Sequence, residues 1–116
     1  MKLAVVGSRE FTNYNELAGY IDFIRESRAI DTIISGGARG TDRLAKRYAR
    51  KTGLGYTEYP ADWEGPLKKG AGFARNTTIA QNCDLMAAFW NGKSHGTKDV
   101  IEKAEKEGRE IYVYFF

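Results

Sequence analysis

Ser35-Gly36-Gly37-Ala38-Arg39-Gly40-Thr41-Asp42 is the stretch of sequence that decides the fold. A short apolar segment at residues 32–34 precedes it, and a helical pattern of apolar residues follows at Leu44, Ala45, Tyr48 and Ala49. This order is typical of a strand, a glycine-rich turn and a helix. Glycines let a ligand approach the main chain, and the first turn of a helix attracts anions. The stretch predicts a phosphate-binding turn with Thr41 as the helix cap, and a tight turn without a ligand is the alternative.

Apolar runs and helical patterns alternate along the rest of the chain. Strands are expected at Leu3–Val6, Thr32–Ser35, Tyr56–Tyr59, Leu85–Trp90 and Ile111–Phe116. Helices are expected from Asn13, from Thr41 to about Lys51, from about Ala71 to Asn82, and around Val100–Ala104. The alternation predicts an α/β fold, a Rossmann-like three-layer sandwich with a five-stranded, mainly parallel sheet in the order 3-2-1-4-5. We expect residues 1–116 to form one domain of this kind.

The composition is typical of a globular cytoplasmic domain. Of the 116 residues, 42% are hydrophobic, and the formal net charge is +3. The one cysteine, Cys83, cannot form an internal disulfide, which fits a reducing compartment. No stretch is long and apolar enough for a membrane span or a signal peptide, so no membrane partner is expected. The mild positive charge suits a phosphorylated ligand or a polyanionic partner.

Three loops should meet at the carboxyl edge of the sheet, where such sheets bind ligands beside the strands at which the sheet order reverses. These loops are residues 7–10, 36–42 and 91–97. Two helix starts on one rim predict a site for two phosphates, or for a phosphate and a ribose. The candidate ligand-binding residues in the loops are Gly7, Ser8, Arg9, Gly36, Gly37, Arg39, Gly40, Thr41, Asp42, Ser94, Gly96 and Thr97.

Charged side chains near these loops indicate the chemistry of the ligand. Arg9, Arg39 and Arg75 can pair with phosphate, although each alone could equally be a solvated surface charge. Arg75 is the strongest of the three, because Arg75 and Asn76 open the helix after the irregular loop at residues 60–72. Asp42 either bonds ribose hydroxyls or is stabilised by the helix dipole without any ligand.

Several familiar sites do not match the sequence. The dinucleotide fingerprint needs Gly-x-Gly-x-x-Gly after the first strand, where Gly7 stands alone. The phosphate loop of ATPases needs a glycine five residues before Gly92, and Ala87 stands there. One histidine and one cysteine cannot make a usual zinc site. The sequence therefore predicts neither a cofactor nor a metal.

Four motifs in order resemble the SLOG superfamily, most closely its short YspA/YpsA-related domains of bacteria and phages. The motifs are Gly7-Ser8-Arg9, Ser35-Gly36-Gly37-Ala38-x-Gly40-x-Asp42, Ala71-Gly72-x-x-Arg75-Asn76 and Ser94-x-Gly96-Thr97. The resemblance covers nearly the whole chain. It implies a Rossmann-like fold that binds a nucleotide or nucleotide-derived ligand, such as a nucleoside monophosphate or an ADP-ribose derivative.

The same resemblance implies two alternative functions. LOG phosphoribohydrolases cleave a base from a nucleoside monophosphate, using an arginine, a Gly-Gly-x-Gly-Thr turn and glutamates. Arg75 looks similar to that arginine and Gly96-Thr97 to the end of that turn, but Asp99 is the only acidic residue where the glutamates would fall. Catalysis therefore stays open, with Arg75 and Asp99 as its candidates. Smf/DprA proteins bind single-stranded DNA, and Trp63 could stack on a base in either kind of ligand.

The last expected strand, Ile111–Phe116, is strongly apolar for a strand at a sheet edge. Native proteins usually cover such an edge. We therefore predict a homo-oligomer. Light scattering at micromolar concentration checks this, and the mass of a monomer would contradict it.

Overall fold

The computed structural model describes residues 1–116, apart from the side chain of Lys69. Its sheet is built from β1 (Lys2–Gly7), β2 (Thr32–Ser35), β3 (Gly55–Glu58), β4 (Leu85–Trp90) and β5 (Glu110–Phe115). The helices are α1 (Tyr14–Arg25), α2 (Thr41–Thr52), α3 (Ala71–Asn82) and α4 (His95–Lys106), with a 3₁₀ turn, η1, at Lys68–Gly70. The strands pair in the order β3-β2-β1-β4-β5, which confirms the predicted order.

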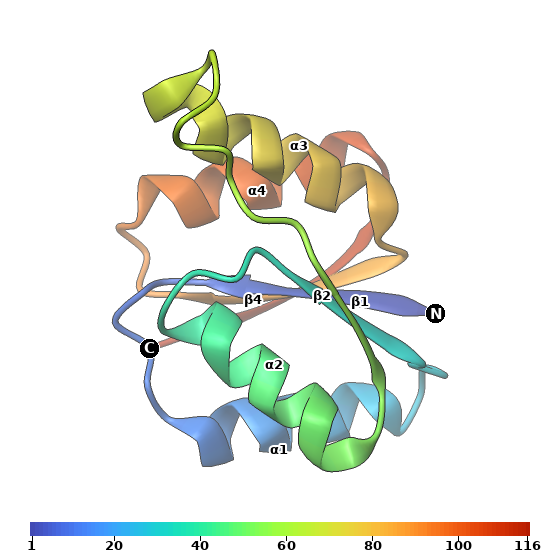
Figure 1. The fold of residues 1–116 in the computed structure, drawn as a ribbon. Coiled ribbons are helices and arrows are strands. Elements are labelled where there is room, and N and C mark those ends of the chain that lie inside the picture. The colour runs from blue at the N-terminus through green and yellow to red at the C-terminus, as the bar shows by residue number, and fades with distance from the viewer.

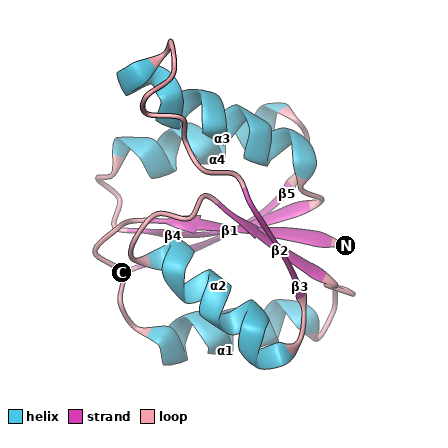
Figure 2. Cartoon of the chain, in the orientation of Figure 1, coloured by secondary structure: helices cyan, strands magenta, loops and turns pink.

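Helices cover both faces of the sheet. Helices α1 and α2 lie on one face and α3 and α4 on the other, as Figures 1 and 2 show. Every strand pair is parallel, because a helix returns the chain to the same end of the sheet before each new strand. The α/β three-layer sandwich is therefore confirmed. No helix in the described part of the chain combines the length and the apolar character that crossing a membrane requires.

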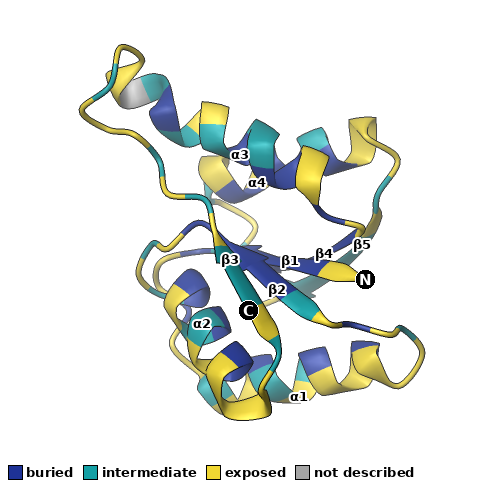
Figure 3. Cartoon of the chain, turned by 45° about the vertical axis from the view of Figure 1, so that its right-hand side comes forward, coloured by how far each residue is buried: buried dark blue, intermediate teal, exposed yellow. Residues whose placement is uncertain are grey.

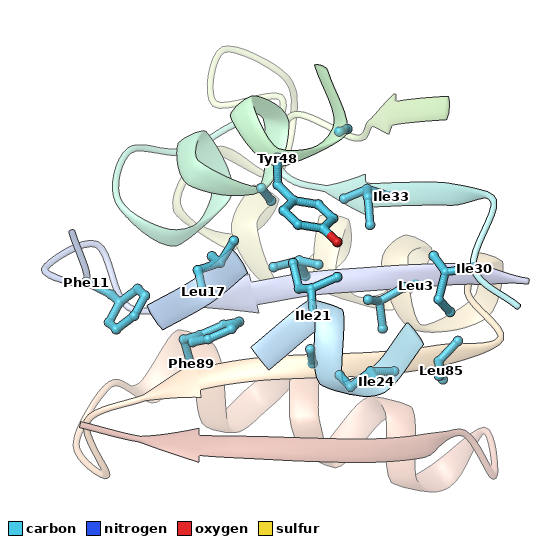
Figure 4. Packing of buried hydrophobic residues seen from close by; sticks show 14 residues of the cluster. Leu3, Phe11, Leu17, Ile21, Ile24, Ile30, Ile33, Tyr48, Leu85 and Phe89 are labelled. Carbon is cyan, nitrogen blue, oxygen red and sulfur yellow. The ribbon is translucent and has the colours of Figure 1, made fainter. Parts of the chain in front are cut away.

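Two apolar clusters hold the layers together. The central strands β1 and β4 are buried on both faces, so alternate residues of each strand enter opposite clusters. On the α1 and α2 face, Leu3, Leu17 and Ile21 belong to one cluster, and Figure 4 shows Ile21 between the other two over the sheet. On the other face, Ala4 and Val6 pack with residues of α3 and α4. Close packing on both faces thus holds the strands in place, and with them the loops that follow their carboxyl ends.

The two edge strands are less buried than the centre. Figure 3 shows β3 in the colours of intermediate and exposed residues, which agrees with its place at the edge in the predicted strand order. At the other edge, β5 is partly buried, and Phe115 keeps 66% of its surface exposed. The prediction of self-association concerns this second edge.

Gly19 gives a test of the helix α1. It lies in the middle of α1, is exposed, and an added Cβ would meet nothing within 4 Å. Alanine loses less backbone entropy than glycine on helix formation, so Gly19→Ala should raise the free energy of unfolding by about 0.5–1 kcal/mol. Urea unfolding measures this change, and an unchanged or lower midpoint would contradict the helix assignment.

Candidate functional site

A cavity of about 570 Å³ opens at the carboxyl ends of β1 and β4. The loop after β1, the start of α3 and the turn before α4 form its walls. The predicted residues that line the cavity are Gly7, Ser8, Arg9, Trp63, Arg75, Asn76, Ser94, Gly96 and Thr97. Residues from four separate parts of the sequence are thus brought to one place.

The glycine-rich loop between β2 and α2 contributes less to this cavity than expected. Among the described residues, Ala38 is its member in the wall. The predicted residues that lie outside the lining are Gly36, Gly37, Arg39, Gly40, Thr41 and Asp42. The ligand roles expected for these residues stay predictions.

Asp42 is buried beneath this loop. Its Oδ2 accepts a hydrogen bond from the backbone N–H of Ala38 at 3.1 Å. Burial raises the pKa of the Asp42 carboxyl from 3.8 to about 6, against the opposing effects of the Ala38 and Gly36 backbone and the charge of Arg75. The chain itself therefore places an anion at the start of α2, and a phosphate at this turn would meet that carboxylate.

The start of α2 differs from the prediction. Gly40, with φ of 75° and ψ of −128°, is the N-cap and offers no side-chain hydrogen bond, so the prediction that Thr41 caps the helix is wrong. Thr41 is instead fully buried, and its hydroxyl donates to the carbonyl of Ser8 at 2.9 Å. The helix begins after Gly40 because the backbone of Arg9 packs directly against this glycine and leaves no room for a side chain. Together these contacts tie α2 to the loop after β1.

Arg75 joins this loop to the cavity. Its Nη1 donates to the carbonyl of Gly36 at 3.1 Å, and its Nε donates to Oδ1 of Asn76 at 3.2 Å. Gly36 has no side chain to obstruct this contact, since an added Cβ would overlap the Arg75 guanidinium. The guanidinium is thus oriented by the protein while it also lines the cavity.

Asn76 continues the same network toward α4. Its Nδ2 donates to the carbonyl of Gly96 at 3.2 Å and to Oδ2 of Asp99 at 3.0 Å. Asp99 also forms an ion pair with Lys103 at 2.9 Å. The Asp99 carboxylate is therefore bound to two protein groups, and it does not line the cavity.

Residues from the first turns of two helices, α3 and α4, line the cavity. Ser94 caps α4, because its Oγ accepts from the N–H of Thr97 at 3.4 Å. Gly72 and Phe73, in the first turn of α3, also line the cavity. Neither helix has an acidic residue in its first turn. No acidic side chain in these first turns therefore opposes an anion, although the 3₁₀ turn before α3 already takes up the N–H of Ala71.

Ser8 is the polar residue of the cavity whose environment is incomplete. It is 3% exposed, and its hydroxyl has no hydrogen-bond partner among the described residues. A buried hydroxyl without a partner costs about 1–3 kcal/mol. Ser8 lines the cavity as a residue, while its Oγ itself is buried, so a ligand would bond this hydroxyl only after a local adjustment of the loop.

The structure also reveals cavity residues that sequence reasoning did not assign. Glu10 accepts a hydrogen bond from Nδ2 of Asn91 at 2.9 Å, and both line the cavity together with Lys93. The ring of Phe73 lies at the rim with 49% of its surface exposed, near the predicted Trp63 with 51%. Glu10 and Lys93 each lie in the loop after a central strand, which is the signal that could have identified them.

Comparisons with known proteins agree with this fold. Residues 1–65 match the profile of the YspA, cpYpsA-related SLOG family. The gene 61 protein of Mycobacterium phage D29 is 39% identical over 82 residues, which make up 66% of this chain and 65% of the phage protein.

Two solved structures share the architecture. DNA processing protein A (DprA) from Streptococcus pneumoniae aligns with a TM-score of 0.73 and 22% identity, over 97% of this chain and 49% of that one. DNA processing protein A from Helicobacter pylori, described for its single-stranded DNA binding mode, aligns with a TM-score of 0.69 and 24% identity, over 97% and 64%. The chain spans less than two thirds of the length of each of these relatives.

Proposed function

The chain belongs to the YspA, cpYpsA-related SLOG family, and we propose that it binds a nucleotide or nucleotide-derived ligand in the cavity beside β1 and β4. Family membership supports a nucleotide- or nucleic-acid-binding module. One observation carries the proposal further: the first turns of α3 and α4, neither of which holds an acidic residue, line one cavity together with Ser8. Such an arrangement suits a phosphate, which accepts hydrogen bonds from backbone and hydroxyl donors alike.

Basic residues around the cavity support the same ligand class. Arg9, Arg75 and Lys93 all line it, and the guanidinium of Arg75 is already oriented by Gly36 and Asn76. A guanidinium held in one orientation can bind phosphate oxygens with little further loss of freedom. The volume of about 570 Å³ falls in the range of small-ligand sites, which runs from about 300 to 1,000 Å³.

Thermal unfolding against a panel of nucleotides tests the proposal. The panel is AMP, ADP, ADP-ribose, cyclic ADP-ribose and NAD. A ligand at one hundred times its Kd stabilises the folded chain by about 2.7 kcal/mol, which is a rise in Tm of roughly ten degrees for a domain of this size. If no member of the panel raises the Tm, the proposal fails for this ligand class.

Ser8→Ala separates binding from stability. Removal of an unpartnered buried hydroxyl should leave the Tm of the ligand-free chain unchanged or slightly higher. The rise in Tm with the best nucleotide of the panel should shrink by at least half, because the ligand loses a donor. If Ser8→Ala keeps the full rise in Tm, Ser8 does not contact the ligand.

Lys93→Gln and Lys106→Gln form a matched pair. Both lysines are exposed, but Lys93 lines the cavity, whereas Lys106 lies in the last turn of α4. Loss of a phosphate partner should weaken nucleotide binding about three- to tenfold for Lys93→Gln. Calorimetric titration should find Lys106→Gln indistinguishable from the unmodified chain, and equal losses in both variants would point to net charge alone.

Single-stranded DNA is a second candidate ligand, favoured by the two exposed rings at the rim. Trp63 and Phe73 could stack on successive bases while Arg9 and Lys93 meet the backbone. Binding to oligonucleotides would then exceed binding to mononucleotides and fall steeply with salt. Affinity that does not increase with strand length would contradict this candidate.

The hydrolase alternative has less support. Asp99, its expected carboxylate, is bound to Asn76 and Lys103 and lies outside the lining of the cavity. Stabilisation of an oxocarbenium-like transition state needs a carboxylate at the sugar. An assay for free base released from AMP tests this alternative directly.

A further inference from the structure

Glu10 is the acidic residue of a cavity whose other charged lining residues, Arg9, Arg75 and Lys93, are basic. An ionised carboxylate only accepts hydrogen bonds, and it repels phosphate. A nucleotide group that contacts Glu10 therefore has to be a hydrogen-bond donor. The question is which part of the ligand supplies that donor.

Asn91 holds the Glu10 carboxylate in place. Its Nδ2 donates to Oε2 of Glu10 at 2.9 Å, while its own Oδ1 accepts from the backbone N–H groups of Lys93 and Ser94, both at 2.9 Å. The carboxylate is thereby positioned relative to the cap of α4. Asn91 is the donor that reaches this carboxylate within the described part of the chain, which leaves acceptor capacity for a ligand.

The position beside α4 favours the sugar as the donor. In a nucleotide the sugar is bonded directly to the phosphate, and the base lies beyond it. A group next to the proposed phosphate site at the start of α4 therefore meets the sugar before the base. The 2′ and 3′ hydroxyls of ribose form an adjacent pair of donors, which suits the two oxygens of a carboxylate, and carboxylates bind ribose hydroxyls in this way in other nucleotide folds.

We propose that Glu10 binds the ribose diol of the ligand and makes the site selective for ribonucleotides over 2′-deoxyribonucleotides. This inference rests on the proposed nucleotide site. It assigns the sugar to a residue of the loop after β1, and it narrows the ligand class to molecules with free 2′ and 3′ hydroxyls.

Calorimetric titration with paired nucleotides tests the selectivity. The probes are the four ribonucleoside 5′-monophosphates, their 2′-deoxy counterparts, and IMP, which lacks the amino group of AMP. For the unmodified chain, each 2′-deoxynucleotide should bind about tenfold more weakly than its ribose partner, the usual effect of one lost hydrogen bond to a charged group. Glu10→Gln and Glu10→Ala should reduce this ratio to about threefold or less.

Glu107→Gln is the matched control, because Glu107 is exposed and lies beyond the end of α4 opposite the cavity. It should keep the full preference for ribose. Equal binding of ribo- and deoxynucleotides by the unmodified chain, or a preference that survives in Glu10→Ala, overturns the inference while the proposed function stands. If Glu10→Ala weakens AMP but not IMP, the base amino group is the partner and the inference is wrong. If no nucleotide binds at all, the proposed function itself fails and the inference with it.

Discussion

Gly40→Ala is expected to lower the free energy of unfolding by about 3 kcal/mol, from a strained backbone and a steric overlap together. Gly40 has a φ of 75° and a ψ of −128°, a conformation that residues with a Cβ rarely adopt. An added Cβ would also press against the backbone of Arg9, which cannot move aside as a flexible side chain could. Because Arg9 lines the cavity, the substitution should also weaken nucleotide binding.

Gly53→Ala is a control for a positive φ without a steric overlap, although Gly53 has the left-handed helical ψ of 13° and Gly40 does not. Gly53 also has a positive φ, 76°, but an added Cβ would meet nothing within 4 Å. Its replacement should cost about 1 kcal/mol from the left-handed conformation alone. Urea unfolding of both variants measures the difference, and equal losses would show that the packing of Arg9 on Gly40 adds nothing.

Asp42→Asn is expected to remove a large pH dependence of stability. The folded chain binds a proton at Asp42 with a pKa of about 6, compared with 3.8 for an exposed carboxyl. Between these values the folded state holds more protons than the unfolded state, so the free energy of unfolding falls as the pH rises. The stability from the protonated carboxyl is fully present below pH 4 and is lost above pH 6, a change of about 3 kcal/mol.

Urea unfolding at pH 4, 5, 6 and 7 measures this effect as the difference between the unmodified chain and Asp42→Asn. Other titrating groups are the same in both and largely cancel. From pH 7 to pH 4, the free energy of unfolding of the unmodified chain should rise by about 3 kcal/mol relative to that of Asp42→Asn. Glu105→Gln, which removes an exposed carboxylate, should show no such shift. A flat difference for Asp42→Asn would mean that the carboxyl is not held in the buried position described.

The fold could be predicted because the local signals agree with one another. Each central strand is an apolar run that ends in a turn, and each is followed by a helix with an apolar face. Parallel pairing and right-handed crossovers then leave few strand orders. The cap at Ser94 could be predicted for the same reason, since a hydroxyl before a helical pattern satisfies the first N–H groups without help from distant residues.

The two carboxylates at the carboxyl edge could not be told apart in the sequence. Asp42 and Glu10 each follow a strand, and the sequence favoured Asp42 for the sugar. In the structure Asp42 lies under its own loop, where it bonds Ala38, while Glu10 lies in the cavity, where it bonds Asn91. The second contact joins residues 81 positions apart, and no local pattern contains it.

The sequence predicts Thr41 as the cap of α2 for a similar reason. Threonine is a common cap residue, but the close packing of Gly40 on Arg9 decides where α2 begins. That packing depends on the approach of two loops from different strands, which becomes visible only when the sheet is assembled. The positions that sequence reasoning missed are therefore those defined by contacts between loops.

The order of the strands in space also has a consequence for the synthesis of the chain. The first 65 residues contain β1, β2 and β3 with α1 and α2, so one face of the growing sheet is covered early. Ala4, Val6 and Ile34 on the other face have their partners in β4, α3 and α4, all of which are translated later. A nascent chain at this stage presents an apolar sheet face and an unpaired edge of β1 to its surroundings, and its cavity lacks a wall until Asn91–Thr97 has left the ribosome.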